Sequence, residues 1–312
     1  MKKIALGCDF GATWIKAGLV SQTGSIISEI REETKAFLGQ AGVLARLELI
    51  ILTLLQRAKN QPVLGLGLGS PGPIDFAKGL VKNPPNLPGW RNVPLKNILS
   101  KKFHLPLFLD NDANCALLGE QWRGAAKGRK NAILLTVGTG IGGAALINGE
   151  IYRGASGAAS EFGHIIIDKS ASEKCGCGHY GCLESLASAT AMSHKMKKVL
   201  NQGRKSAIHK SEKIDSLAIY QAAKKGDKLA IEVLTDAGRN LGLGVKNLIN
   251  IFEPEVIVIS GQLVKAQKYF WPAMRKEVKK NCLIKGVPMV KAKLGDNAGL
   301  LGAAFMVFKS SS

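Results

Sequence analysis

The first third of the chain alternates short apolar runs with glycine-containing turns. Three β-prone runs come first, at residues 4–11, 15–21 and 25–33, and their close spacing predicts an antiparallel meander. The elements predicted after it are an amphipathic helix at about 41–59, a buried strand at 63–69, a Pro/Gly/Asn-rich loop at 70–90, a strand at 105–110 and a helix from about 113.

From residue 131 the same order begins again. Apolar runs at 131–138 and 141–148, and a short run after the Asn148-Gly149 turn, predict a second meander. The elements predicted after it are helices at about 184–200, 216–225 and 228–252, a strand at 255–260, a helix near 263–280, a strand at 287–294 and a last helix.

Two meanders, each followed by helices and strands, predict an α/β protein with two lobes of similar topology. A chain of 312 residues is also long enough for two cores. We expect a small lobe from residues 1–118, completed by the C-terminal helix at 298–312. The large lobe would span residues 119–297.

The charge balance adds little to this picture. Lys and Arg number 43 against 23 Asp and Glu, which gives a formal net charge of +20. Such a charge attracts anions, but the basic residues are dispersed along the chain with little aromatic interleaving, which favours a Lys-rich surface. We therefore expect no specific nucleic-acid partner.

The N-terminus resembles a signal peptide for a few residues only. Met1-Lys2-Lys3 precedes an apolar run, but Cys8-Asp9 ends that run early and no small-residue cleavage site follows. We also expect no apolar stretch long enough to span a bilayer. The sequence thus predicts a cytoplasmic protein without a membrane partner.

The six cysteines fall into two groups. Cys8, Cys115 and Cys282 are isolated in apolar or helical contexts, where we expect buried thiols. The other three lie within eight residues, and in a reducing cytosol such clustering indicates a metal site before a disulfide.

The clustered cysteines are Cys175, Cys177 and Cys182, and two histidines compete for a fourth position. His179 lies inside the segment, whereas His164 precedes it in what we predict to be a strand. Three sulfur ligands and one nitrogen ligand, with no open position, are typical of structural zinc. Such a site has no place for a reactive water, so the metal would be structural.

Each meander contains a glycine-rich turn that suits phosphate binding. Glycine lets backbone N–H groups approach phosphate oxygens, threonines add hydroxyl donors, and an Asp at a strand end can hold Mg²⁺ directly or through water. The residues in question are Asp9, Gly11, Thr13, Gly138, Thr139 and Gly140. Because the turns recur at the same place in both halves, we expect the lobes to clamp one nucleotide.

Two common nucleotide motifs do not fit this sequence. It contains no G-x-x-x-x-G-K-[ST] segment, which excludes a P-loop enzyme. The glycines at 138, 140 and 143 lead into a predicted strand, where a dinucleotide site would open a helix. A dehydrogenase is therefore not expected.

The segment 110–114, Asp-Asn-Asp-Ala-Asn, lies where a buried strand ends and a helix begins. Open α/β sheets bind ligands at such places. One of these residues would serve as an N-cap, but the group exceeds what a cap requires. We assign Asp112 as general base for a sugar hydroxyl, Asn111 as a sugar-positioning residue and Asp110 as structural.

The loop at 83–90 is open to two interpretations. It could be a rigid surface connection, or a sugar-binding loop that exposes Asn86 and Trp90. The residues alone do not decide between the two.

Taken together, these residues resemble the ROK family, whose name combines repressors, open reading frames and kinases, within the actin-like ATPase superfamily. The matching segments are Asp9–Thr13, Gly69–Asp75, Asn86–Trp90, Asp110–Asn114, Glu161–His164, Cys175–Glu184 and Asp296–Gly299. The resemblance implies two lobes of duplicated actin-like (RNase H-like) topology, with a nucleotide and sugar cleft between them.

The resemblance also implies ATP, Mg²⁺ and structural Zn²⁺ as cofactors and a dimer or tetramer as the assembly. It implies Asp112 as catalytic base. The sugar ligands that it implies are Gly72, Asn86, Asn111, Asp112, Glu161, His164 and Glu184. The zinc ligands that it implies are His164, Cys175, Cys177 and Cys182, and adenosine would lie near Gly261 and residues 238–247. With these roles, we expect the metal to lie apart from ATP, so that its removal weakens sugar binding and changes ATP binding little.

Three positions depart from the family pattern. Ala12 and Ser160 stand where the family often has glycine, and Ser260-Gly261 replaces a Gly-Gly pair. The added groups would narrow a phosphate turn or the adenine site, although no catalytic group is lost.

The expected function is phosphorylation of glucose to glucose 6-phosphate. N-acetylmannosamine, N-acetylglucosamine and fructose are the alternative sugars. A sugar-responsive repressor is a rival from another class, but its DNA-binding domain would precede the first strand, which starts here at Ile4. A non-catalytic sugar sensor is a further alternative, and the presence of Asp112 argues against it.

Overall fold

The computed structural model describes residues 3–59, 61–84, 86–209, 213–261 and 268–310. The chain forms two compact units. The first takes residues 1–130, 144–159 and 292–312, and the second takes residues 131–143 and 160–291. Each unit is described by itself.

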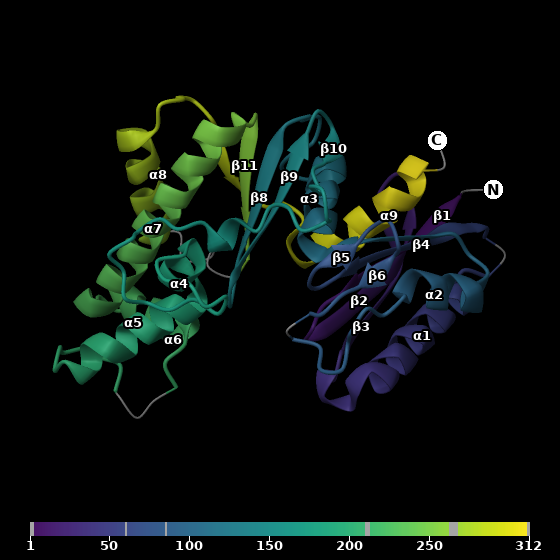
Figure 1. The fold of residues 1–312 in the computed structure, drawn as a ribbon, viewed down its shortest axis with the longest axis horizontal. Helices are drawn as coiled ribbons and strands as arrows, with labels where there is room; N and C mark the ends of the chain where they lie inside the picture. Colours follow the sequence, from purple (N-terminus) through teal and green to yellow (C-terminus); the bar gives the residue numbers. More distant parts are fainter. Residues whose placement is uncertain (1–2, 60, 85, 210–212, 262–267, 311–312) are drawn as a thin grey trace. The chain divides into compact units, whose positions relative to one another are not determined.

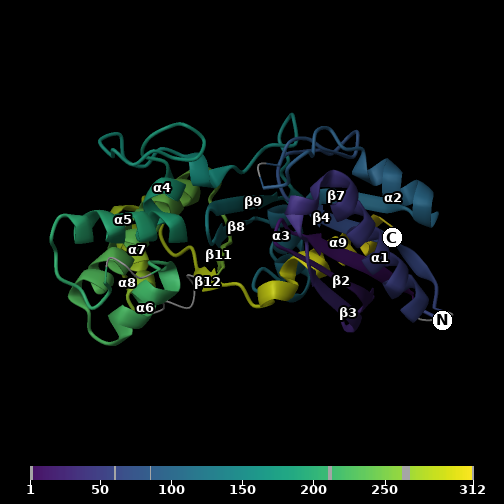
Figure 2. The ribbon, with the colours of Figure 1, turned by 90° about the horizontal axis from the view of Figure 1, so that it is seen from below.

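The first sheet has the strand order β3-β2-β1-β4-β7; Figure 1 labels the first four of these strands and Figure 2 labels β7. Its strands are β1 (Ile4–Phe10), β2 (Trp14–Ser21), β3 (Ile26–Glu33), β4 (Val63–Ser70) and β7 (Leu107–Asn111). The first three pair antiparallel, which confirms the predicted meander. Strand β4 runs parallel to both β1 and β7, so the carboxyl ends of these three strands meet at one edge.

Helices cover both faces of this sheet. They are α1 (Gly39–Arg57), α2 (Leu95–Phe103), α3 (Asp112–Arg123) and α9 (Ala298–Ser310). Because strand side chains alternate between faces, Leu6 packs in the core that includes α1, whereas Ala5 packs with α9. Helix α9 approaches so closely that a Cβ on Gly7 would lie 2.2 Å from the Leu300 carbonyl oxygen.

The residues before β7 contain two elements that the prediction missed. A hairpin of β5 (Ile74–Asp75) and β6 (Leu80–Val81) interrupts the loop at 70–90. Helix α2 starts directly after Pro94 and buries its apolar face through Leu95 and Leu99. Proline followed by an i, i+4 leucine pair is a helix-start signal that was available in the sequence.

The expectation that the apolar stretches are too short to span a bilayer is wrong. Among the described residues, the helical segment Ala36–Arg57 is long and apolar enough, by length and composition alone. Core helices pass the same test. One face of the segment, including Val43, Leu47 and Ile51, is buried in the first unit, while Leu49 and Leu52 are exposed.

The second sheet repeats the topology of the first, with the order β10-β9-β8-β11-β12. Its strands are β8 (Ala132–Val137), β9 (Ile141–Ile147), β10 (Glu150–Ile151), β11 (Val256–Ser260) and β12 (Met289–Lys291). When the strands of each sheet are counted along the chain, both sheets have the order third, second, first, fourth, fifth. This repetition confirms the predicted duplicated α/β topology. Strand β12 is shorter than the predicted 287–294.

The helices that follow are α4 (Leu183–Ala187), α5 (Ala189–Asn201), α6 (Ser216–Lys224), α7 (Lys228–Phe252) and α8 (Phe270–Asn281). The single helix predicted at 184–200 is broken at Ser188, whose side chain caps α5 by accepting from Ala191 N at 3.1 Å. Helix α7 has the predicted bounds and packs along α8 (Figure 2). Part of the predicted start of α8, at 263–267, lies outside the described residues.

Candidate active site

In the first unit, Asp110 to Asn114 stand at the junction of β7 and α3, as predicted. Asn111 is the N-cap of α3, since its side-chain oxygen accepts from Ala113 N at 2.9 Å. Its amide nitrogen also donates to the Gly72 carbonyl at 3.3 Å. Asn111 is therefore oriented by both of its side-chain polar atoms.

Asp110 has the structural role expected of it. Only 2% of the residue is exposed, and one carboxylate oxygen accepts from Asn111 N and from Asn114 Nδ2, each at 2.8 Å. The other oxygen receives Arg153 Nε at 2.9 Å and Nη2 at 2.7 Å. These two charge-assisted bonds to one oxygen anchor the end of β7 to the segment after β10.

Asp112 opens α3 and accepts from its neighbour Ala113 N at 2.8 Å. Its negative charge acts on Asp9 of strand β1, which β4 separates from β7 in the sheet. Burial, then repulsion from Asp112 and Asp296, raises the pKa of Asp9 to about 7, although Lys16 acts in the opposite direction. A cation placed among these carboxylates would relieve the repulsion.

The turn between β1 and β2 is held by a residue that sequence reasoning missed. Thr34 is fully buried, and its hydroxyl donates to the Gly11 carbonyl at 2.6 Å. Its backbone N–H donates to the Thr13 carbonyl at 2.8 Å, while Gly11 N donates to Trp14 O at 2.9 Å. A lone threonine after a strand carries no sequence signal for this role, because the pairing appears only in the folded sheet.

The loop at 83–90 exposes Asn86 as expected, but the expectation for Trp90 is wrong. Trp90 is 1% exposed, and its ring lies 5.2 Å from that of Phe10. Together with the buried Leu87, it anchors the loop to the core of the first unit. Pro85 lies outside the described residues.

In the second unit, the turn from Gly138 to Gly140 links β8 and β9. Gly138 N donates to Gly140 O at 3.0 Å, which closes the turn. The start of α5 holds its carbonyls: Ala189 N donates to Gly138 O at 2.9 Å, and Thr190 Oγ1 donates to Thr139 O at 2.8 Å.

The predicted metal ligands come together in the same unit. The donor atoms of His164, Cys175, Cys177 and Cys182 all lie within 4.8 Å of one another. His164 Nδ1 lies 3.5 Å from Cys175 Sγ, and the sulfurs of Cys177 and Cys182 are 3.7 Å apart. His179 is not part of this four-donor cluster, although its Nδ1 lies 3.5 Å from Cys177 Sγ.

The His164–Cys175 and Cys177–Cys182 distances match those expected around a tetrahedral zinc ion. Zn–S bonds of about 2.3 Å and Zn–N bonds of about 2.0 Å place neighbouring donors roughly 3.5–3.8 Å apart. Burial raises the pKa of Cys182 to about 12 and also raises that of Cys175, whereas hydrogen bonds from His179 lower the pKa of Cys177 to about 6. The two buried sulfurs would need a cation beside them to be thiolates at neutral pH.

The backbone around His164 differs from the prediction. Phe162–His164 is a 3₁₀ helix, so His164 does not lie on a strand. Exposed Glu161 directly precedes that helix. Ser160 has a left-handed φ of 68°, and its buried hydroxyl has no hydrogen-bond partner among the described residues. Glycine would adopt this φ without strain.

The glycines expected near adenosine have packing roles. Gly261 has a φ of 101°, and a Cβ there would lie 2.2 Å from the Val137 carbonyl. A Cβ on Gly238 would lie 2.3 Å from the carbonyl of Phe270 in α8. These glycines allow α7, α8, β8 and β11 to approach closely.

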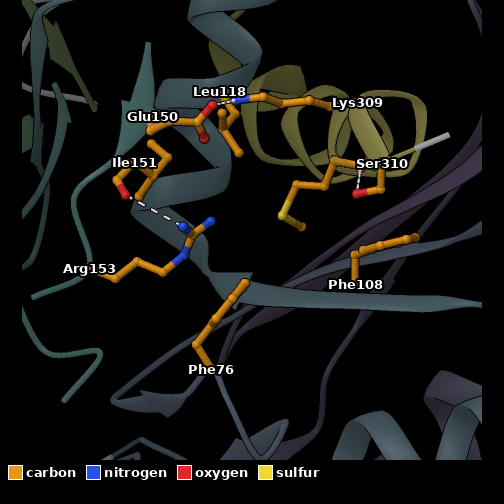
Figure 3. A pocket seen from close by; sticks show the side chains of 9 residues that line it. Phe76, Phe108, Leu118, Glu150, Ile151, Arg153, Lys309 and Ser310 are labelled. Carbon is orange, nitrogen blue, oxygen red and sulfur yellow. Dashed lines mark hydrogen bonds and ion pairs between the residues drawn. The ribbon is translucent and has the colours of Figure 1, made fainter. Parts of the chain in front are cut away.

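A cavity of about 310 Å³ lies on the first unit, and Arg153 is one of the residues that line it (Figure 3). Phe76 and Phe108 form part of its wall, and the guanidinium of Arg153 lies 4.1 Å from the Phe76 ring. Its two cations are already paired, Arg153 with Asp110 and Lys309 with Glu150. We therefore assign no substrate to this cavity.

The family model of the ROK family matches residues 5–310. The chain belongs to the ROK family. It is 35% identical to a glucokinase of Thermotoga maritima, over 98% of each chain. It is also 34% identical to a xylose repressor of Caldicellulosiruptor bescii, over 97% of this chain and 77% of the repressor.

Among solved structures, the ROK chain resembles a ROK family glucokinase from Streptomyces griseus in complex with glucose and AMPPNP. The TM-score is 0.81 at 29% identity, over 98% of this chain and 99% of the other. This likeness confirms the two-lobed α/β fold class, whereas the functions of the relatives differ.

Proposed function

We propose that this ROK protein is an ATP-dependent hexose kinase that moves the γ-phosphoryl group of ATP onto a sugar hydroxyl, with glucose as the expected sugar. The observation that carries the proposal is the glycine turn at the same position in both sheets, with Asp112 opening a helix at the edge of the first. The glucokinase relatives support the same reaction class.

In the proposed reaction, Asp112 accepts the proton of the attacking sugar hydroxyl. The sugar oxygen then bonds to the γ-phosphorus, the bond to the β–γ bridging oxygen breaks and ADP leaves. A carboxylate at the first position of a helix suits this role, because the backbone holds it rigidly. Asn111, fixed at both side-chain polar atoms, would orient the sugar.

Further sugar ligands are proposed from both units. In the first, these are Gly72 and the exposed Asn86. In the second, Glu161, His164 and Glu184 would bind sugar hydroxyls.

The phosphates of ATP would contact the two turns, Asp9–Thr13 and Gly138–Gly140, and adenosine would lie near Gly261. The raised pKa of Asp9 supports a role for it in holding Mg²⁺, directly or through water. The magnesium ion, when bound, would neutralise charge that develops on the phosphoryl oxygens.

The ligand set His164, Cys175, Cys177 and Cys182 would hold one structural zinc ion. Zinc would fix the segment that carries His164 and Glu184, and it has no open position for a reactive water. With one ring nitrogen on the metal, His164 keeps the other for a sugar hydroxyl.

A sugar-responsive regulator is the second candidate, because a xylose repressor is 34% identical over 97% of the chain. An assay of ADP release with glucose, fructose, N-acetylglucosamine and N-acetylmannosamine separates the possibilities. Glucose-dependent ADP release supports the proposal, and release with another sugar of the panel corrects the substrate. Sugar binding without ADP release would overturn the kinase in favour of the regulator.

We also propose a homodimer or homotetramer located in the cytoplasm. Light scattering of the purified protein tests the assembly, and a single-chain mass would contradict it.

A further inference from the structure

Glu184 lies between two features of the second unit, the candidate metal ligands and the Gly138–Gly140 turn. It lies in the first turn of α4, the helix whose N-cap is the metal-ligand candidate Cys182. One carboxylate oxygen, Oε2, accepts from Ile141 N at 2.8 Å, directly after the phosphate turn. The other, Oε1, lies 3.7 Å from Cys175 Sγ.

The Gly138–Gly140 turn packs directly against this carboxylate. A Cβ on Gly140 would lie 2.3 Å from Glu184 Oε2, so a larger residue would displace the glutamate. The same stretch of chain continues to Ala189 and Thr190, which hold the carbonyls of Gly138 and Thr139. The α4–α5 segment therefore contacts three consecutive residues of the turn and the residue that follows them.

The resemblance gives Glu184 only a sugar-binding role. We propose that Glu184 is also a positioning residue, which transmits the geometry of the metal-binding segment to the Gly138–Gly140 turn and so sets the affinity for nucleotide phosphates. This inference rests on the proposed function, because it takes the turn to bind phosphate.

The physical route is short. A metal bound through Cys175 and Cys182 fixes the N-terminus of α4, and Glu184 follows two residues after Cys182. A helix of five residues has little stability of its own, so its position depends on these attachments. When they loosen, the Ile141 amide loses its acceptor and the turn loses the contacts that orient its backbone N–H groups.

This inference revises the expectation that removing the metal changes ATP binding little. A residue that binds sugar alone would lower sugar affinity and leave nucleotide affinity unchanged when no sugar is present. A residue that positions the phosphate turn changes nucleotide affinity without any sugar. The two roles thus differ in one measurable quantity.

The experiment titrates Mg²⁺–AMPPNP into the metal-loaded protein by calorimetry in the absence of sugar. For Glu184→Ala we expect about ten-fold weaker binding, the loss equivalent to one charge-assisted hydrogen bond. Glu184→Gln should be intermediate, because its amide oxygen can still accept from Ile141 N. Thr190→Val should weaken binding about three-fold, and the matched Thr190→Ser, which keeps the hydroxyl, should bind like the parent.

A second readout needs no ligand. Amide hydrogen exchange of residues 138–142 should accelerate in Glu184→Ala and in the parent after chelation of the metal. Parental nucleotide affinity and exchange in Glu184→Ala would overturn the inference. Were Glu184→Ala to misfold, parental binding in both Glu184→Gln and Thr190→Val would overturn it instead. Failure of the parent to bind nucleotide would refute the proposed function, whereas parental binding with unaltered variants refutes only this inference.

Discussion

The two units each present an acidic side chain in the first turn of a helix, but they support it differently. Asp112 opens α3, a helix of 12 residues that follows directly from strand β7. Glu184 lies in α4, a helix of five residues that follows a segment of cysteines and glycines. That segment has only isolated bridges, such as Lys174 to Tyr180 and Ile166 to Cys182.

The difference lies in what fixes each backbone. The start of α3 is held by sheet pairing and by the buried Asp110–Arg153 pair, which need no bound cofactor. The start of α4 follows Cys182, one of four metal-ligand candidates whose donor atoms lie within 4.8 Å of one another. These donors need a bound cation to hold the segment in place. One carboxylate is thus positioned by the fold and the other by proposed metal bonds.

The largest expected effect is on catalysis in the first unit. Asp112→Asn should lower kcat by roughly two to four decades, because the amide cannot accept the proton. Sugar affinity should stay nearly unchanged, since the amide retains the shape and hydrogen-bonding reach. Steady-state kinetics and sugar titration measure both quantities. Turnover close to that of the parent would remove Asp112 from the role of base.

The next largest effect is expected from removing the metal, which should change the second unit and leave the first unchanged. The parent should contain about one zinc per chain by elemental analysis. Cys177→Ser should lose most of it, because a hydroxyl is a poor zinc ligand beside a thiolate. His179→Ala is the control and should keep the metal, since His179 lies outside the four-donor cluster.

Chelation should accelerate amide exchange in α4 and leave α3 unchanged. Equal acceleration in both helices would show that the metal does not act on α4 in particular. An active protein that contains far less than one zinc per chain would also contradict the proposed role of the metal.

Within the first unit, Arg153→Met tests the support of Asp110. The change leaves a carboxylate that is 3% exposed without its cation, which should cost about 3 kcal/mol of unfolding free energy. Arg204→Met is a matched control, because Arg204 makes a similar two-bond pair with Glu232 on the surface. Chemical denaturation should show little change for the control. Equal losses in the two variants would show that burial does not matter here.

The smallest effect is expected at Ser160, in the second unit. Ser160→Gly should stabilise the protein by about 1 kcal/mol, because glycine tolerates the φ of 68° and removes a buried hydroxyl without a described partner. Ser160→Ala removes the hydroxyl but keeps the strained Cβ, so it should gain less. Thermal unfolding compares the two, and a larger gain for alanine would attribute the cost to the hydroxyl alone.

Much of the site could be predicted where short segments carry the information. The cysteine spacing and the strand-to-helix position of Asp110 to Asn114 are local, and both agree with the structure. Trp90 was misplaced because an aromatic residue in a polar loop looks exposed until its packing partner Phe10 is known. The prediction ran one helix through Ser188, whose capping bond with Ala191 N appears only in the structure.

The sequence by itself determined the two meanders, the duplicated order of elements and the residue types of both candidate sites. These follow from periodicity, turn chemistry and ligand spacing, which act over a few residues. Only the tertiary structure decided that Arg153 neutralises Asp110, that Thr34 holds the glycine turn between β1 and β2, and that Glu184 contacts the glycine turn between β8 and β9. Each of these contacts joins residues 20 or more positions apart, and such pairs are set by how strands and helices pack.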